Sequence, residues 1–204
     1  MHEVAVGLLG LGTVGSGVIQ ILEQNAEDIQ NRSQSRIKVT KVLVRNVNAP
    51  RKIAGDFKLT DNPQDILADP EISIIVEVMG GIEPARSYIL EAFKQGKNVV
   101  TANKDLLALH GHELLEAAKE AGKDLYFEAS VAGGIPIIAA LKQSLAGNKI
   151  SEVLGIINGT TNYILSAMTE QGRDYAEVLK EAQELGYAEA DPTADVEGLD
   201  AARK

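Results

Sequence analysis

The chain has 204 residues, of which 45% are hydrophobic and 24% are charged, a balance typical of a globular protein and not of a disordered one. Its formal net charge of -9 excludes nucleic acid and anionic membranes as main partners, because both need a basic surface. The absence of cysteine excludes disulfides, thiolate metal sites and a cysteine nucleophile.

The amino-terminal segment, MHEVAVGLLGLG, lacks a basic region followed by a cleavage site. No apolar stretch of the chain reaches the roughly 18 residues that a membrane-spanning helix needs. The sequence therefore predicts a cytoplasmic protein. Its length suits one domain plus part of another.

The first half alternates short β-branched runs with longer amphipathic stretches, which is typical of βαβ units around a parallel sheet. Helices are expected after the first strand, around Ile66 and over Pro84–Lys94. The predicted strands are Val4–Leu9, Ile37–Val44, Ile72–Val78 and Asn98–Thr101.

The character changes near Leu125, where LYFEASVAGGIPII predicts a short strand, a glycine turn and a helix through Leu145. We place a domain junction here, with a first domain over residues 1–128 and the beginning of a second, α+β domain over 129–204. In the second domain we expect one strand and two helices, at Val153–Ile157, Tyr163–Met168 and Tyr175–Leu185.

A GxGxxG pattern lies directly after the first predicted strand and opens a helix. It consists of Gly10, Leu11, Gly12, Thr13, Val14 and Gly15. Such glycines let the backbone approach a pyrophosphate at the amino end of a helix. An ordinary glycine-rich turn is the alternative, but the strand and helix around it favour dinucleotide binding. We therefore predict a Rossmann-type, doubly wound α/β sheet.

The second predicted strand ends with Arg45 and is soon followed by Arg51 and Lys52. NAD-selective folds usually carry an acidic residue at this position, whereas a 2′-phosphate calls for cations. Arg45 can pair with a phosphate through two hydrogen bonds, while Arg51 and Lys52 are equally well explained as surface charges. The sequence favours NADP(H), and NAD(H) stays possible.

Four further motifs follow the glycine turn: TANK ending at Lys104, EASVAGGIPII from Glu128, GIINGTTNYIL from Gly155 and GYAEADPTADVEGLDAARK from Gly186. In this order and spacing they resemble the successive motifs of homoserine dehydrogenases. The resemblance covers essentially the whole chain, and the last motif is the most specific. Members of that family continue beyond the position of Lys204, so the resemblance is to their amino-terminal portion.

The resemblance implies that L-homoserine and L-aspartate 4-semialdehyde are interconverted by hydride transfer with NAD(P)(H), in the biosynthesis of threonine, methionine and isoleucine. A hydride that reaches an aldehyde carbon leaves charge on the oxygen, so the site needs a proton donor and a cation. The resemblance makes Lys204 the proton donor. It makes Lys104 a second catalytic or substrate-orienting lysine beside the cofactor.

The α-ammonium group of the substrate calls for carboxylates, and Glu189, Asp195 and Asp200 precede Lys204. By composition alone they would be a solvated acidic loop. The resemblance instead implies that Glu189 and Asp200 bind homoserine, with Asp195 behind them. It places Gly186 against the nicotinamide.

The resemblance also implies a monovalent-cation site made by Glu128 and the carbonyls of Val131, Gly133 and Ile135. Carboxylate and carbonyl oxygens suit a hard ion such as sodium. The alternative is a buried structural glutamate at a hinge. Residues Asn158–Asn162 are expected to shape the strand-to-helix turn of the substrate domain. Direct contact with a ligand is the less favoured alternative.

The residues disfavour two rival functions. An aspartate-semialdehyde dehydrogenase acylates a cysteine, which this chain lacks. A nucleotide-sensing module without catalysis would not need Lys104, the acidic cluster and Lys204. The resemblance implies a small-molecule substrate, no nucleic acid or membrane partner and a homodimer in the full-length enzyme. The 204 residues alone are expected to bind cofactor with little or no turnover.

Overall fold

The computed structural model describes residues 2–51, 53, 55–188 and 191–203. The chain divides into two compact units, Met1–Gly134 and Ile135–Lys204, which are taken in turn. The domain boundary after residue 128 stays a prediction.

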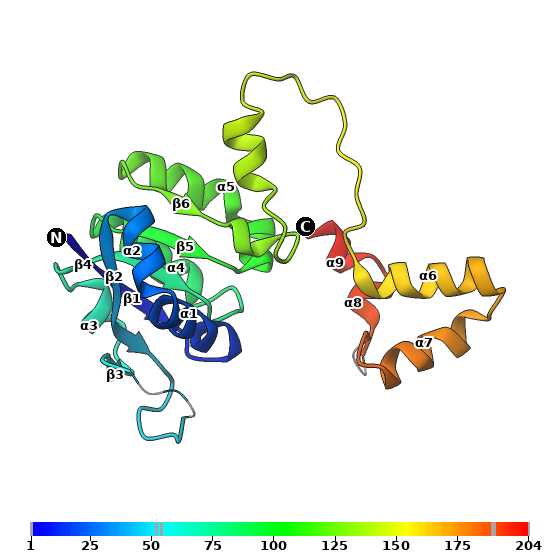
Figure 1. Cartoon of the computed structure of the whole chain (residues 1–204), viewed down its shortest axis with the longest axis horizontal. Coiled ribbons are helices and arrows are strands. Elements are labelled where there is room, and N and C mark those ends of the chain that lie inside the picture. The colour runs from blue at the N-terminus through cyan, green and yellow to red at the C-terminus, as the bar shows by residue number, and fades with distance from the viewer. Residues whose placement is uncertain (1, 52, 54, 189–190, 204) are drawn as a thin grey trace. The chain divides into compact units, whose positions relative to one another are not determined.

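The first unit is a six-stranded sheet in which every neighbouring pair is parallel, with helices packed against it (Figure 1). Its strands are β1 (His2–Leu9), β2 (Ser35–Leu43), β3 (Lys58–Thr60), β4 (Ile72–Glu77), β5 (Asn98–Thr101) and β6 (Leu125–Tyr126). The order β3-β2-β1-β4-β5-β6 is that of a doubly wound dinucleotide-binding sheet. The predicted fold class is therefore confirmed.

The helices of this unit connect successive strands, as parallel pairing requires. They are α1 (Thr13–Gln24), α2 (Ala26–Ser33), α3 (Gln64–Leu67), α4 (Ala85–Lys94) and α5 (Lys104–Glu120). The helices expected after the first strand, around Ile66 and before Lys94 are all present.

Successive side chains of a strand point to opposite faces of a sheet, and both faces of this sheet are buried in hydrophobic clusters. Val6 and Leu8 of β1 pack with Ile19 of α1 in one hydrophobic cluster. Leu9 belongs to a second cluster, together with buried residues of α3, α4 and α5. A strand covered on both faces is held rigidly, so the loops at its carboxyl end have a firm base.

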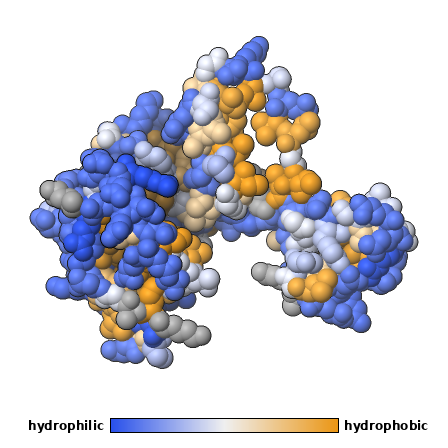
Figure 2. All heavy atoms as spheres, viewed as in Figure 1, coloured by the Kyte–Doolittle hydropathy of each residue, from blue (hydrophilic) through white to orange (hydrophobic). Residues whose placement is uncertain are grey.

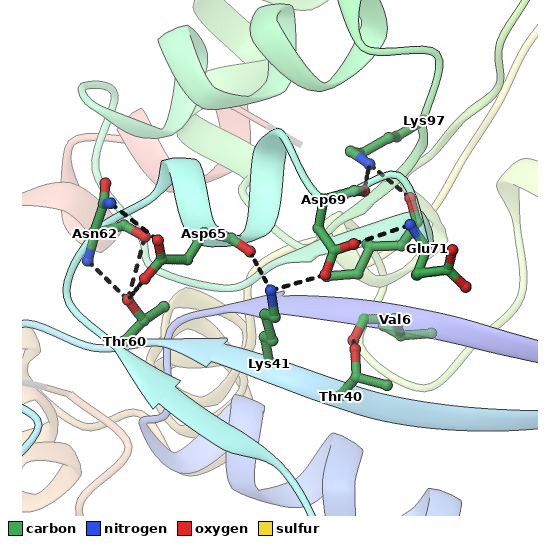
Figure 3. Close-up of polar contacts among 10 residues, drawn as sticks. Val6, Thr40, Lys41, Thr60, Asn62, Asp65, Asp69, Glu71 and Lys97 are labelled. Atoms are coloured by element: carbon green, nitrogen blue, oxygen red, sulfur yellow. Dashed lines mark hydrogen bonds and ion pairs between the residues drawn. The ribbon is translucent and has the colours of Figure 1, made fainter.

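Buried and half-buried lysines fasten the α3 region to the sheet (Figure 3). Lys41 Nζ lies 2.8 Å from Asp69 Oδ2 and donates a 2.7 Å bond to the carbonyl of Asp65. The hydrogen bond from Lys41 holds the pKa of Asp69 below its usual value. Lys97 is buried and donates to the carbonyls of Asp69 and Ile72, and burial lowers its pKa.

The second unit is built around α6 (Gly159–Gln171) and α7 (Tyr175–Glu184), which lie side by side in Figure 1. Gly172 ends α6 in the left-handed conformation, and the Asp174 side chain caps the start of α7. Its small core contains Ile164, Ala167, Val178, Ala182 and Ala188. The remaining helices are short: η2 (Ala140–Ser144), α8 (Thr193–Val196) and α9 (Leu199–Ala202).

The prediction of a strand at Val153–Ile157 is wrong. These residues form no strand, and no other strand occurs in the described residues of the second unit. Leu154 is 83% exposed and Ile156 is 76% exposed, so apolar side chains line the surface before α6 (Figure 2). A strand needs a hydrogen-bonded neighbour, and the described part of this unit provides none.

None of the helices in the described part of the chain combines the length and the apolar character that crossing a bilayer requires.

Candidate functional site

The glycine turn after β1 is shaped by close backbone contacts. Gly10 has a φ of 104°, and a Cβ atom there would lie 2.9 Å from the Val78 carbonyl oxygen. A Cβ on Gly15 would lie 2.2 Å from the carbonyl oxygen of Gly10. At Gly12, by contrast, an added Cβ would meet no described atom within 4 Å. The first and third glycines therefore permit the turn, and the second leaves room for a ligand.

A cleft of about 560 Å³ opens at this turn. It lies at the carboxyl ends of β1 and β4, where the strand order reverses and doubly wound sheets bind their ligands. Gly12 caps α1 without a side chain, which leaves the first amides of the helix for a phosphate. The cleft is lined by the glycine turn, the segment after β2 and the loop after β4, including Gly10, Gly12, Arg45, Asn46, Val78 and Gly80.

Arg45 lines the cleft and is exposed there. Arg51 also lines it, but its guanidinium donates to the carbonyls of Asn46, at 2.5 Å, and Ala49, at 2.8 Å. Arg51 thus holds the loop that follows Arg45. It is half-buried, so it is not the solvated surface charge that the sequence left open as one alternative. Lys52 lies outside the described residues.

Asp61 is an acidic residue of this cleft that the sequence reading missed. It directly follows β3, a strand of three residues that is too short to show a hydrophobic pattern. Pairing of β3 with β2 brings Asp61 to the same edge of the sheet as Arg45.

Glu77, the last residue of β4, is fully buried and was also missed. Its Oε1 accepts a 2.8 Å hydrogen bond from the amide of Met79, and its Oε2 accepts one of 2.7 Å from the Thr101 hydroxyl. Thr101 in turn accepts from the amide of Asn103. The available signal was a charged residue at the end of an apolar run, SIIVEV, at the ligand-binding edge of the sheet.

Asn103 and Lys104 connect this network to α5. The Asn103 side chain accepts from the amide of Leu106 and so caps the helix, while its Nδ2 donates 2.7 Å to the Gly81 carbonyl. Lys104 is the first residue of α5. A cation at that end of a helix opposes the helix dipole, so the dipole does not explain a lysine at this position.

In the second unit a pocket of about 570 Å³ gathers the predicted substrate residues that the structure describes. Asn158 is buried, and its Nδ2 donates 2.7 Å bonds to both Asp195 Oδ1 and Asp200 Oδ2. Asp200 is buried as well. The pocket is lined by Asn158, Gly159, Thr160, Tyr163, Gly186, Tyr187, Asp195 and Asp200.

Gly186 lies in this pocket with a φ of 78°, which suits glycine in the turn after α7. The Thr160 hydroxyl donates a 2.6 Å bond to the carbonyl of the next residue, Tyr187. The rings of Tyr163 and Tyr187 lie 5.0 Å apart. The predicted substrate ligand Glu189 and proton donor Lys204 both lie outside the described residues.

The predicted cation ligands Glu128, Val131 and Gly133 share one short turn of the first unit, and Ile135 belongs to the second unit. Gly133 has a φ of 58°. Among the described residues no three His, Asp or Glu side chains gather as a metal site would need. A cation beside Glu128 would therefore depend on backbone carbonyls.

The reversed strand order, the open glycine turn and the cleft beside it define a protein with a Rossmann-type dinucleotide-binding domain. Residues 10–128 match the family model "Homoserine dehydrogenase, NAD binding domain", and residues 136–204 match the model "Homoserine dehydrogenase". The chain belongs to the homoserine dehydrogenase family. The resemblance seen in its motifs is thereby confirmed, and the cofactor of its first domain is a nicotinamide dinucleotide.

Individual relatives agree. The homoserine dehydrogenase of Bacillus subtilis is 50% identical over 205 residues, which cover 100% of this chain and 47% of the relative. A solved homoserine dehydrogenase from Thiobacillus denitrificans is 53% identical with a TM-score of 0.91, covering 99% of this chain and 47% of that one. A hyperthermophilic archaeal homoserine dehydrogenase in complex with NADPH is 28% identical with a TM-score of 0.83, covering 99% and 67%. The chain spans about half the length of the curated relatives it matches.

Proposed function

We propose that the protein containing this chain interconverts L-homoserine and L-aspartate 4-semialdehyde by hydride transfer with NADP(H). The observation that carries the proposal is a pair of carboxylates, Asp195 and Asp200, which both accept a hydrogen bond from the side-chain amide of Asn158 in one pocket. The preceding domain of the chain matches the NAD-binding domain of homoserine dehydrogenases. An amino-acid substrate presents an ammonium group, and a carboxylate pair is its natural counterpart.

The preference for NADP(H) is supported by Arg45 in the cleft and by the lack of an acid at the end of β2. Arg51 reinforces it by holding the loop that follows Arg45. Asp61 in the same cleft acts in the other direction, because its charge repels a 2′-phosphate. A relative of known structure contains NADPH.

The bound nicotinamide supplies or accepts the hydride. Asp200 and Glu189 bind the substrate ammonium group, and Asp195 lies in the same pocket as Asp200. Lys204 donates a proton to the developing alkoxide in reduction and accepts it in oxidation, while Lys104 orients the substrate from the start of α5. The family resemblance places Gly186, which has no side chain, against the nicotinamide.

Two further properties follow from the family resemblance alone. Glu128 with the carbonyls of Val131, Gly133 and Ile135 binds a monovalent cation such as sodium. The complete polypeptide forms a homodimer, which sedimentation would test.

The activity is tested by adding L-homoserine and NADP+ to the complete gene product and following NADPH formation. We expect turnover with L-homoserine and little with 4-hydroxybutyrate, which keeps the hydroxyl but lacks the ammonium group. If the protein binds NADPH but does not reduce NADP+ when homoserine is added, the proposal is contradicted and a nucleotide-sensing module is favoured.

A further inference from the structure

The side chain of Asn158 has a defined orientation at the first turn of α6. Its Oδ1 accepts 2.8 Å hydrogen bonds from both the amide and the hydroxyl of Thr161. An amide N–H can only donate, so the oxygen of Asn158 must face the helix. Its NH₂ group therefore points away from α6, toward the carboxylates of Asp195 and Asp200.

The two carboxylates come from different short helices. Asp195 lies in α8, Asp200 lies in α9, and Gly198 between them has a φ of 78°. Two like charges brought this close repel each other, most strongly where one of them is buried, as Asp200 is. Asn158 is neutral and gives each carboxylate one hydrogen, so it holds both without neutralising either.

We propose that Asn158 is the positioning residue of the substrate pocket: it sets the spacing and direction of Asp195 and Asp200 so that together they grip the ammonium group of a small amino-acid substrate. The inference rests on the proposed function. It goes beyond the expected role of residues 158–162 in shaping a turn. It also makes Asp195 a direct partner of the substrate.

A capping role and a positioning role are separated by Asn158→Asp. Aspartate caps a helix as well as asparagine does, so the bond from the Thr161 amide survives. The donor to the two acids is replaced by a third carboxylate, which pushes them apart. Asn158→Ser is the second variant, because serine also caps a helix but adds no charge.

We expect the homoserine KM to rise about tenfold to a hundredfold in Asn158→Asp, and less in Asn158→Ser, from the loss of charge-assisted hydrogen bonds. The NADP+ KM should change much less than the homoserine KM, because the cleft proposed for the pyrophosphate and the 2′-phosphate is made of residues of the first unit. A purely structural defect would instead lower the melting temperature and alter both KM values together.

Asp174→Asn is the matched control. Asp174 caps α7 by accepting from the amide of Ala176, and it is exposed. This variant replaces aspartate by asparagine, the opposite of Asn158→Asp, at the start of another helix. Asparagine keeps the capping hydrogen bond. Both KM values should equal those of the unaltered enzyme.

The decisive measurement is a double-mutant cycle in the complete gene product, with Asp195→Asn as the second change. Since Asn158 acts through the acids, Asn158→Ser should raise the homoserine KM much less in the Asp195→Asn background. Strictly additive effects would mean that Asn158 binds the substrate itself, and an unchanged KM in Asn158→Ser would leave it a helix cap; either result overturns the proposal. Failure of the unaltered enzyme to oxidise homoserine would refute the proposed function and this inference with it.

Discussion

Residues of the same type have different roles around the dinucleotide cleft. Arg45 and Arg51 both line it, but Arg51 uses its guanidinium on the carbonyls of Asn46 and Ala49, whereas Arg45 is exposed. Asp61 adds a negative charge to the same cleft. We expect the balance among these three charges to set the preference between NADP(H) and NAD(H), because only NADP(H) carries the 2′-phosphate.

Replacing Arg45 by alanine is expected to weaken NADPH binding about tenfold to a hundredfold and to leave NADH nearly unchanged. The reason is that a hydrogen bond to a charged group contributes about 1.5–3 kcal/mol. Titration of the protein with each dinucleotide measures the effect. Arg36→Ala is the control, since Arg36 is an exposed arginine of β2 that does not line the cleft. Equal losses for both dinucleotides would remove Arg45 from the 2′-phosphate site.

Glu128→Ala in the complete gene product is expected to lower activity and to abolish any stimulation by sodium, because the remaining carbonyls carry no full negative charge. Initial rates measured with sodium chloride and with choline chloride at equal ionic strength provide the comparison. If activity and salt response are both unchanged, Glu128 is a structural residue of the turn.

The start of α5, where Lys104 stands, is fastened to the loop that lines the cofactor cleft. Glu77 at the end of β4 holds both the Met79 amide and the Thr101 hydroxyl, and Asn103 adds a bond to the Gly81 carbonyl. The loop after β4 and the turn before α5 are therefore fastened to each other. Since the first of them lines the cleft, the orientation of Lys104 depends on contacts that also shape the dinucleotide site.

Asn103→Ala should lower the free energy of unfolding by about 1–2 kcal/mol, through loss of the cap, and should also raise the NADP+ KM. Asn103→Asp keeps the cap but cannot donate to the Gly81 carbonyl, so it should raise the KM with a smaller loss of stability. Denaturant unfolding and steady-state kinetics separate the two effects. Asn25→Ala is the control, because Asn25 stands at the start of α2 without a capping bond from its side chain. If the NADP+ KM changes in neither Asn103 variant, the hydrogen bond from Asn103 to the Gly81 carbonyl does not affect dinucleotide binding.

The two units differ in the size of the hydrophobic core that each buries. The first unit has two hydrophobic clusters, one on each face of its sheet. The second has a small helical core, while Val153, Leu154 and Ile156 stay largely exposed before α6. The acids of the substrate pocket are carried by helices of four residues each, which have little stability of their own.

A polypeptide of residues 1–204 is therefore expected to bind NADPH but to oxidise homoserine poorly or not at all. Its cofactor unit buries its own core, whereas catalysis needs the substrate groups held to within a fraction of an ångström. A misplaced general acid alone removes roughly 10²–10⁴-fold in rate. Dinucleotide affinity and turnover should be measured on one preparation, beside the complete gene product. Comparable turnover from both would refute this expectation, and failure to bind NADPH would show that the cofactor unit does not fold alone.

The amino-acid sequence was enough to predict the fold class, most strands of the sheet, the glycine turn and the family. These depend on local signals: runs of β-branched residues, a glycine pattern between a strand and a helix, and short motifs in a fixed order. The prediction of a strand at Val153–Ile157 was wrong because it also depended on a local signal. An apolar run predicts a strand, but it does not show which strand will pair with it.

Which side chains contact one another could be seen only in the folded chain. Glu77 and Thr101 are 24 residues apart, and Asn158 reaches Asp195 and Asp200 across 37 and 42 residues. Pairing of the three-residue strand β3 with β2 brings Asp61 to the same edge of the sheet as Arg45, and both line one cleft. Contacts of this kind form where packed elements bring distant residues together, and no local pattern encodes the distance between them.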